Sequence, residues 1–441
     1  MTSFTTPHLH LPDLCSPRPD LSSPDLRTIH NLFTSNYYTQ TRCNQLLDSY
    51  VRPQLLTKNL GWDGSSFYNH SSKHVVEWNK TPFQILTALF LFGSEIDYNT
   101  ILSVLGSENF ELLLSWKFIK KTHTTLISPY SGAHQIYPLT VNSTTADTTA
   151  LILTDWPFLN PDLPTQFAVM PVGYDSLELC VLSNLEKIGE NRSVCDICCG
   201  SGIQGINYLL NNKNERIKVN FIDLNPRALS LCEFNVAFNN LNRDEHTFTV
   251  SNCWSSISQK KNDVILCNPP FVAVPETENE VKHYYADGGG DGNNSLKKIF
   301  SEVIERLNDD GVCLMVTELP NVLSSDKLVR RFLGDKEGKV DVAYVKEDVE
   351  TIEEYSKVRN EEMGNLISVK EYVSGVNVSE DVGFIVDRAL VLIKVGRKEG
   401  EDKLHKFESG QKEVKEYEFG ADEPDAFLGE EGRRFLAEVM K

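Results

Sequence analysis

Apolar residues recur at a helical spacing in the first part of the chain. Thr81-Pro82 is typical of a helix start, because Thr can cap the helix and Pro suits its first turn. The spacing predicts three short helices: one that begins at Thr81, one over Tyr98–Leu105 and one over 108–116. An alternating pattern then predicts a hairpin that pairs 124–127 with 134–139 across Ser131-Gly132. Helices followed by a hairpin predict a small helical, winged-helix-like module.

From about residue 166 short apolar strands alternate with helices. The predicted strands are Ser193–Ile197, 217–222, Thr247–Val250, 264–267, 312–316, 340–345 and 389–395. The predicted helices are 203–210, Pro226–Phe238 and 295–307. This alternation is typical of a largely parallel sheet with helices on both faces, whose strands end along one edge where ligands bind. The sequence therefore predicts an α/β, Rossmann-like domain with a seven-stranded sheet.

The patterns divide the 441 residues into four predicted parts. They are a flexible arm over 1–30, an N-terminal substrate-selection module over 31–165, the α/β domain over 166–396 and a charged extension over 397–441. The formal net charge is −19, with 43 Lys and Arg against 62 Asp and Glu. This charge argues against binding nucleic acid by broad neutralisation of its phosphates, and it does not exclude a local basic strip.

Cysteine usage and hydropathy bear on the compartment. Ten cysteines are scattered through the chain, which excludes a disulfide scaffold and favours the reducing cytoplasm. The apolar run over 85–92 is too short to cross a bilayer, and the start of the chain lacks a secretory pattern, so no membrane partner is expected. Cys195-x-x-Cys198-Cys199 has no second Cys or His pair, and no metal is expected. No pattern specifies an oligomeric state.

The most informative segment is the glycine-rich turn that follows the first strand of the α/β domain. Gly200 and Gly202 let the backbone approach a ligand, and Gly205 lets the next helix pack closely on the strand. Asp223 ends the next strand, where a carboxylate can accept hydrogen bonds from ribose hydroxyls. Asp196 lies inside the end of the first strand, which suits a cationic amino group better than a pyrophosphate.

The turn resembles a known motif. Asp196-x-Cys198-x-Gly200-x-Gly202 is similar to motif I of the class I S-adenosylmethionine-dependent methyltransferases, and Asp223-Leu-Asn-Pro226 resembles their acidic ribose-binding loop. Asn252-Cys253 falls at the family's adenine-contacting loop, where Asp is common, and Gly173-Tyr-Asp-Ser176 falls at the loop that closes over the methionine part. The resemblance implies S-adenosyl-L-methionine as cofactor, bound by Asp196, Cys198, Gly200, Ser201, Gly202, Asp223, Leu224, Asn252, Cys253 and Asn268.

A second motif, Asn268-Pro-Pro-Phe271, follows the fourth strand of the α/β domain. Its two prolines fix φ and remove two N–H donors, so the tip offers acceptors: the Asn268 side-chain oxygen and the Pro269 carbonyl. Two acceptors suit the two hydrogens of a planar NH₂, and Phe271 can stack on a flat substrate. The tetrapeptide is similar to the hallmark of methyltransferases that act on adenine, guanine or glutamine amino nitrogens. The resemblance implies that the catalytic residues are Asn268, Pro269, Pro270 and Phe271.

Several functions remain open at this point. An exocyclic amine of an RNA base is the first acceptor, favoured by Phe rather than Tyr at position 271. A protein glutamine, methylated at N5, follows closely because the chain is acidic. An NAD-dependent oxidoreductase that uses the Gly-x-Gly-x-x-Gly turn would leave the Asn268-Pro-Pro-Phe271 motif without a role. A scaffold that binds the cofactor without catalysis would not require intact Asp196, Asp223 and Asn268.

Two further features have two interpretations each. The segment from Tyr284 to Gly292 is either a lid with residues 288–290 as its hinge or a surface loop. Trp254 either borders the adenine pocket or belongs to the core.

Overall fold

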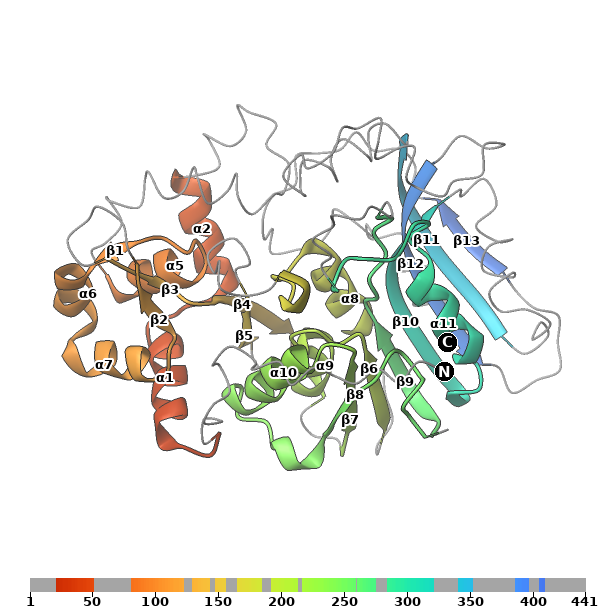
Figure 1. The fold of residues 1–441 in the computed structure, drawn as a ribbon, viewed down its shortest axis with the longest axis horizontal. Coiled ribbons are helices and arrows are strands. Elements are labelled where there is room, and N and C mark those ends of the chain that lie inside the picture. The colour runs from red at the N-terminus through yellow and green to blue at the C-terminus, as the bar shows by residue number, and fades with distance from the viewer. Residues whose placement is uncertain are drawn as a thin grey trace.

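The structure is a computed structural model that describes twelve segments of the chain. They are residues 21–50, 81–122, 129–142, 147–155, 165–184, 192–212, 216–258, 260–274, 284–320, 340–351, 385–395 and 404–408. The predicted strand over 124–127 and the predicted arm before residue 21 lie outside them. A helical part lies on the left of Figure 1 and a large sheet on the right.

The large sheet has eight strands. Their order across the sheet is β13-β11-β12-β10-β9-β6-β7-β8. The bounds are β6 Ser193–Ile197, β7 Lys218–Asp223, β8 Thr247–Val250, β9 Asn262–Cys267, β10 Leu307–Pro320, β11 Val340–Thr351, β12 Ile385–Val395 and β13 Leu404–Glu408. β8, β7, β6, β9 and β10 run parallel, whereas β12 lies antiparallel between β10 and β11. The five parallel strands therefore end at one common edge.

Helices cover both faces of this sheet, as predicted. They are α8 Tyr174–Asn184, α9 Ile203–Asn211 and α10 Pro226–Phe238 on one face, with α11 Asn294–Glu302 on the other. Alternate residues of β6 enter different cores: Val194 packs with α9 and α10, whereas Cys195 and Ile197 pack with α11. Both faces of the parallel strands are therefore buried, which explains their nearly continuous apolar sequences.

The structure adds one strand to the predicted seven. β13 lies inside the predicted charged extension and pairs in parallel with β11, as the far right of Figure 1 shows. The Lys- and Glu-rich sequence around it has few apolar positions, so its pattern predicts a charged extension and no strand. An edge strand needs fewer apolar residues, since one of its two long sides faces outward. The predicted helix over 295–307 was also too long, because β10 already begins at Leu307.

The N-terminal part contains short helices and two small sheets. The helices are α1 Pro24–Ser35, α2 Gln40–Tyr50, α5 Pro82–Phe90, α6 Tyr98–Leu105 and α7 Ser107–Ser115. The strands are β1 Ile96–Asp97, β2 Ile119–Lys121, β3 Pro129–Gly132, β4 Gln135–Asn142 and β5 Asp147–Thr154. One sheet has the order β1-β3-β2, and β4 and β5 form the other. The three predicted helices are present, and Thr81 caps α5 by accepting the Gln84 N–H.

Two predictions about the N-terminal part were wrong. Ser131-Gly132 is not a hairpin turn, because both residues lie in β3, which pairs with β1 and β2, whereas the predicted second strand falls largely in β4, which pairs with β5. Gly132 lies within β3, where a Cβ would collide with the Leu89 carbonyl of α5, so close packing rather than a turn requires glycine there. The predicted arm over 1–30 was too long, because α1 begins at Pro24 with Ser23 as its cap.

The N-terminal part and the sheet share one hydrophobic core around α10. Phe238 of α10 lies edge-on to Phe33 of α1, with ring centroids 6.4 Å apart, and 5.7 Å from the ring of Phe118. The same cluster of buried residues includes members of α5, β4, β5 and α9. This continuity fixes β4 and β5 against the helices that follow the glycine-rich turn.

Candidate functional site

The glycine-rich turn ties the ends of β6 and β7 together. The Gly205 N–H donates to Asp196 Oδ2 at 2.9 Å, and the Gly200 N–H donates to Asp223 Oδ2 at 2.8 Å. Gly200 and Gly202 have φ values of 52° and 79°, in the left-handed region that favours glycine. A Cβ on Gly205 would meet the Phe221 ring, which agrees with its predicted role in helix packing. The structure therefore brings the predicted motif I residues and Asp223 to one place.

Asp196 is a buried carboxylate, and one of its two oxygens accepts no hydrogen bond from the described residues. Its side chain is only 1% exposed, and no described residue bonds to Oδ1. Burial raises the pKa of Asp196 to about 7; the charge of Asp223 acts in the same direction and the Gly205 N–H opposes it. Burying an ionised carboxylate is unfavourable unless a cation or donor compensates for the lost water. The site is therefore suited to a ligand that brings a cationic amino group to Oδ1.

Asp223 offers the second acidic position. Its Oδ1 accepts the Asn225 N–H at 2.8 Å, so each carboxylate oxygen already has one backbone donor and keeps one lone pair. Burial raises the pKa of Asp223, while the N–H groups of Asn225 and Gly200 lower it. Leu224 beside it is 49% exposed, an apolar surface next to an acceptor pair. A nucleoside fits this combination, with hydroxyls on Asp223 and a base along Leu224.

The loop after β8 places two more predicted residues. Asn252 is exposed, and its Oδ1 accepts a hydrogen bond from Lys298 Nζ at 3.1 Å. Cys253 lies beside Cys198; that thiol and the Lys298 ammonium lower the pKa of Cys253, while burial raises it. Trp254 is 3% exposed and donates from Nε1 to the Ile299 carbonyl. Trp254 therefore belongs to the core, the second of its two interpretations.

The Asn268-Pro-Pro-Phe271 turn follows β9, next to β6 in the sheet. Asn268 Nδ2 donates to Asp175 Oδ2 at 2.9 Å and to Ser176 Oγ at 3.4 Å. Both amide hydrogens are thereby used, and no described residue donates to Oδ1. Asp175 and Ser176 thus fix which end of the amide stays open, and that end is an acceptor. The sequence placed these two residues in a loop near the cofactor but did not predict this contact.

The segment from Tyr284 to Gly292 supports the same turn. The Val272 N–H donates to the Ala286 carbonyl at 2.9 Å, and the Gly288 N–H donates to the Val272 carbonyl at 2.8 Å. A Cβ on Gly288 would lie 2.8 Å from the Phe271 carbonyl carbon, and one on Gly292 would lie 2.6 Å from the Phe271 oxygen. The glycines allow two backbones to pack together, so the described segment is packed against the turn rather than loose, and its role as a lid stays a prediction.

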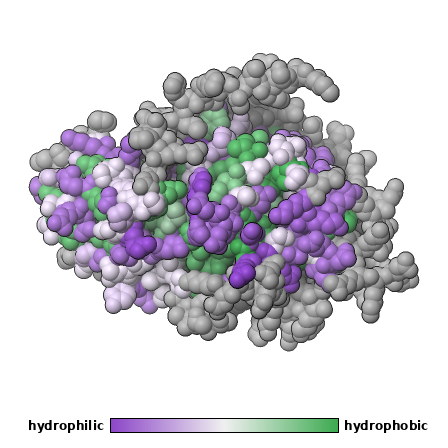
Figure 2. All heavy atoms as spheres, turned by 90° about the horizontal axis from the view of Figure 1, so that it is seen from below, coloured by the Kyte–Doolittle hydropathy of each residue, from purple (hydrophilic) through white to green (hydrophobic). Residues whose placement is uncertain are grey.

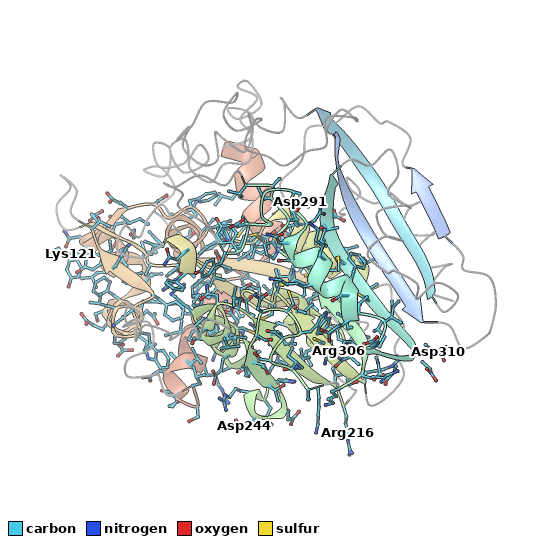
Figure 3. The ribbon with its side chains drawn as sticks, turned by 45° about the vertical axis from the view of Figure 1, so that its right-hand side comes forward. Lys121, Arg216, Asp244, Asp291, Arg306 and Asp310 are labelled. Carbon is cyan, nitrogen blue, oxygen red and sulfur yellow. The ribbon has the colours of Figure 1, made fainter. Side chains whose placement is uncertain are left out.

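Among the described residues, the charged side chains around the Asn268-Pro-Pro-Phe271 turn are mainly acidic. The Asp175 carboxylate accepts a hydrogen bond from Asn268, and the backbone of Asp287 forms an isolated β-bridge with that of Val272. Asp291 forms an ion pair with Lys297, with 2.6 Å between Oδ2 and Nζ. In Figure 3, Asp291 lies in the upper half of the molecule, whereas Arg216 and Asp310, near the starts of β7 and β10, lie in the lower half. Figure 2 views the molecule from below, where hydrophilic and hydrophobic residues are interspersed.

Within the described part of the chain, no group of three or more His, Cys, Asp or Glu side chains is arranged to hold a metal ion. Cys195 and Cys199 are buried, and Cys198 is half-buried. None of the helices that the structure describes combines the length and apolar character required to cross a membrane.

Among solved structures, a class I S-adenosylmethionine-dependent methyltransferase from Listeria monocytogenes aligns over 57% of this chain and 68% of its own, with 10% identity and a TM-score of 0.34. A TM-score this low carries no argument about the family to which the chain belongs. The family model for the methyltransferase small domain matches residues 173–337, which contain both strand exits described above.

Curated relatives cover this region. A protein from Methanocaldococcus jannaschii named as a protein N5-glutamine methyltransferase is 31% identical over 146 residues, which are 32% of this chain and 70% of that protein. A release factor glutamine methyltransferase from Clostridium botulinum is 30% identical over 30% of this chain and 50% of its own length. A ribosomal RNA large subunit methyltransferase G from Colwellia psychrerythraea is 33% identical over 20% of this chain and 23% of its own. The chain thus spans half or less of the last two relatives. It belongs to the methyltransferase small domain family, whose members are S-adenosylmethionine-dependent methyltransferases.

Proposed function

We propose that this enzyme methylates the side-chain amide nitrogen of a glutamine in a protein partner. The observation that carries the proposal is the Asn268 amide, whose hydrogens are bound by Asp175 and Ser176 so that its oxygen is left to accept from a substrate NH₂. S-adenosylmethionine, when bound, supplies an electrophilic methyl group on a sulfonium. The rest of the chemistry falls to the residues around it.

The cofactor fits the residues at the end of β6 and β7. Asp196 Oδ1 lacks a partner among the described residues and suits the ammonium of the methionine part. Asp223 suits the ribose hydroxyls, and exposed Leu224 suits one face of the adenine. A Cβ on Gly200 would meet nothing within 4 Å, so the turn offers open space for a ligand. We assign Cys198, Ser201 and Gly202 to the wall of this pocket, and Asn252 and Cys253 to its adenine end.

Asn268 and Pro269 prepare the acceptor nitrogen. The lone pair of an amide nitrogen is delocalised, so the group is a poor nucleophile. Hydrogen bonds from its two hydrogens to Asn268 Oδ1 and the Pro269 carbonyl would hold it in line with the methyl group. Pro269 and Pro270 stiffen the turn, and Phe271 covers the acceptor. The nitrogen becomes acidic once it is methylated, so its proton leaves afterwards, and catalysis consists mainly of positioning and electrostatics.

Charge supports a protein acceptor. A nucleic acid needs cations to neutralise its phosphates, and affinity falls with each one that is missing. Of the two described lysines of α11 near the site, Lys297 is neutralised by Asp291, and Lys298 donates a hydrogen bond to the neutral Asn252 side chain. Arg227 is buried in an ion pair with Asp155. The site edge therefore favours a neutral amide on a protein, and reverses the order of acceptors expected from the sequence.

An exocyclic amine of an RNA base is the second candidate. Phe271 favours it, because unpaired bases commonly stack on aromatic side chains. Relatives named as ribosomal RNA large subunit methyltransferase G support it too. A base in a duplex would first have to be flipped out, so a single-stranded loop is the easier target.

Methyl transfer from radiolabelled S-adenosylmethionine to total protein and to total RNA, measured side by side, tests the acceptor. Label in a protein band that is released as N5-methylglutamine on proteolysis is the expected result, and N268A is the inactive control. Label confined to RNA would overturn the glutamine proposal and favour the second candidate. Label in neither fraction, from enzyme that binds S-adenosylhomocysteine, would contradict both.

We also propose a cytoplasmic location. The nine cysteines in the described part of the chain are all free thiols, which a reducing compartment maintains.

A further inference from the structure

Two asparagines, Asn235 in helix α10 and Asn239 at its C-cap, complete the open edge of strand β5. Asn235 Oδ1 accepts the Leu153 N–H, and its Nδ2 donates to the Leu153 carbonyl, both at 2.9 Å. Asn239 makes the same pair of bonds with Leu151, at 2.8 and 2.9 Å. Each side-chain amide thus replaces the backbone of a neighbouring strand.

The match follows from the dimensions of the two elements. Four residues of an α-helix rise roughly 6 Å, and two residues of a strand rise roughly 6.6 Å. Asn235 and Asn239 are four apart, and Leu151 and Leu153 are two apart, so the two amides meet alternate residues of the strand. Asn235 is fully buried and Asn239 is 8% exposed, which makes these bonds costly to leave unmade.

Asn235 has one contact that Asn239 lacks. Its second amide hydrogen is donated to the Ser201 carbonyl at 2.9 Å, whereas that of Asn239 goes to the carbonyl of Asn235. Ser201 is 5% exposed and lies between Gly200 and Gly202, both with positive φ. Glycines make this turn conformationally permissive, so its ordering has an entropic cost unless another group holds it.

We infer that Asn235 is a positioning residue for the cofactor, because one amide holds both the β4–β5 hairpin and the carbonyl of the motif I turn. The inference rests on the turn being the S-adenosylmethionine site, but not on which acceptor is methylated. It assigns the N-terminal part a role in cofactor affinity as well as in packing.

Three other contacts strengthen the same connection. Asp155, next to the end of β5, forms a buried ion pair with Arg227 of α10, with 2.6 Å between Oδ1 and Nη2. Asp155 Oδ2 also accepts the Val169 N–H at 2.8 Å. The Asn225 side chain, which caps α10 next to Asp223, donates to the Phe167 carbonyl. The hairpin and the turn are therefore parts of one rigid unit.

The test compares N235A with N239A in the full-length chain. Both variants lose two hydrogen bonds to β5, but only N235A releases the Ser201 carbonyl. Calorimetry with S-adenosylhomocysteine should show about tenfold weaker binding for N235A, the effect of one or two lost buried hydrogen bonds, and a change under about twofold for N239A. KM for S-adenosylmethionine should rise in N235A while kcat stays within about twofold. Thermal unfolding of each variant shows whether the two losses of stability are comparable.

Equal weakening in both variants, or none in N235A, would overturn the inference. If N235A does not fold, N235S leaves a short hydroxyl donor and a smaller void, and the same calorimetry applies. Hydrogen exchange of the turn peptide over 199–205 gives a second measurement, with faster exchange expected only in the Asn235 variants. Lost methyl transfer with unchanged S-adenosylhomocysteine binding would instead concern the acceptor, and so the proposed function.

Discussion

Two neighbouring strands, β6 and β9, end at the same edge of the sheet in turns of opposite chemistry. The β6 exit is built from glycines, and the N–H groups of Gly200 and Gly205 donate to the carboxylates of Asp223 and Asp196. The β9 exit is built from prolines, which have no N–H, and it presents the oxygen of Asn268. One turn is permissive and is held by side chains around it, whereas the other is stiff by its own covalent structure.

This difference in chemistry supports the proposal that the cofactor binds at the β6 exit and the acceptor amide at the β9 exit. The glycine-rich exit is surrounded by carboxylates and so suits a ligand with a cation and hydroxyls. The stiff exit has an uncharged acceptor that suits a neutral NH₂. Changes at β6 should therefore act on cofactor affinity, and changes at β9 on turnover.

The largest effect is expected from N268A. The alanine removes the side-chain acceptor, and kcat should fall by about 10²- to 10³-fold, the usual loss for one electrostatic contact to the reacting group. Binding of S-adenosylhomocysteine should change by less than about threefold, measured by calorimetry. Equal losses of turnover and binding would break the proposed division between the two turns.

D196N should weaken S-adenosylhomocysteine binding by about 10- to 100-fold, because a charge-assisted hydrogen bond is lost. It should also change the pH dependence of stability. Asp196 has a pKa of about 7 when folded against an ordinary value of 3.8, so between these values the folded protein holds a proton that the unfolded chain has released. The free wild-type protein therefore loses stability as the pH rises from about 4 to about 7, and D196N lacks this loss.

Thermal unfolding of the free proteins between pH 4 and pH 8 checks this prediction. D196N should unfold at a higher temperature than the wild type at pH 8, and the difference should shrink toward pH 4. A difference that is constant over this range would show that burial of the carboxylate is not its source.

The smallest effect is expected at Asp175, which contacts Asn268 rather than a substrate. D175A should lower kcat by about tenfold, because the Asn268 amide loses the acceptor that fixes its orientation. D175N keeps an oxygen at that position and is the matched control, expected to retain most of the activity. A steady-state assay that found both variants equally impaired would indicate a role for the charge of Asp175 instead.

Local patterns were sufficient for much of the fold. The strands of the parallel half are short apolar runs. Gly200, Gly202 and Asp223 were sufficient to predict from the sequence which edge of the sheet holds the candidate cofactor site. The sequence predicts a hairpin turn at the wrong place, because Ser131-Gly132 looks like a turn. Gly132 is instead required by close packing against the carbonyl of Leu89 in α5, which is distant in the sequence.

The contacts that complete the site were not accessible from sequence spacing. Asp175 lies 93 residues before Asn268, and nothing local indicates that one amide will donate to that carboxylate. The role of Asn235 could not be predicted from the sequence either, since asparagine within a helix is usually a solvent-facing residue. The run of glycines over 288–290 indicates a special backbone conformation, but its close approach to the backbone of Phe271 could not be predicted because it depends on tertiary packing.

The asparagine-completed edge of β5 has a consequence for biosynthesis. The groups that satisfy Leu153 follow it by 82 residues, so a chain emerging from the ribosome carries a bare strand edge until α10 has been made. Unpaired edges are templates for association with other chains. Slow translation between residues 153 and 239 should therefore increase aggregation of the nascent chain.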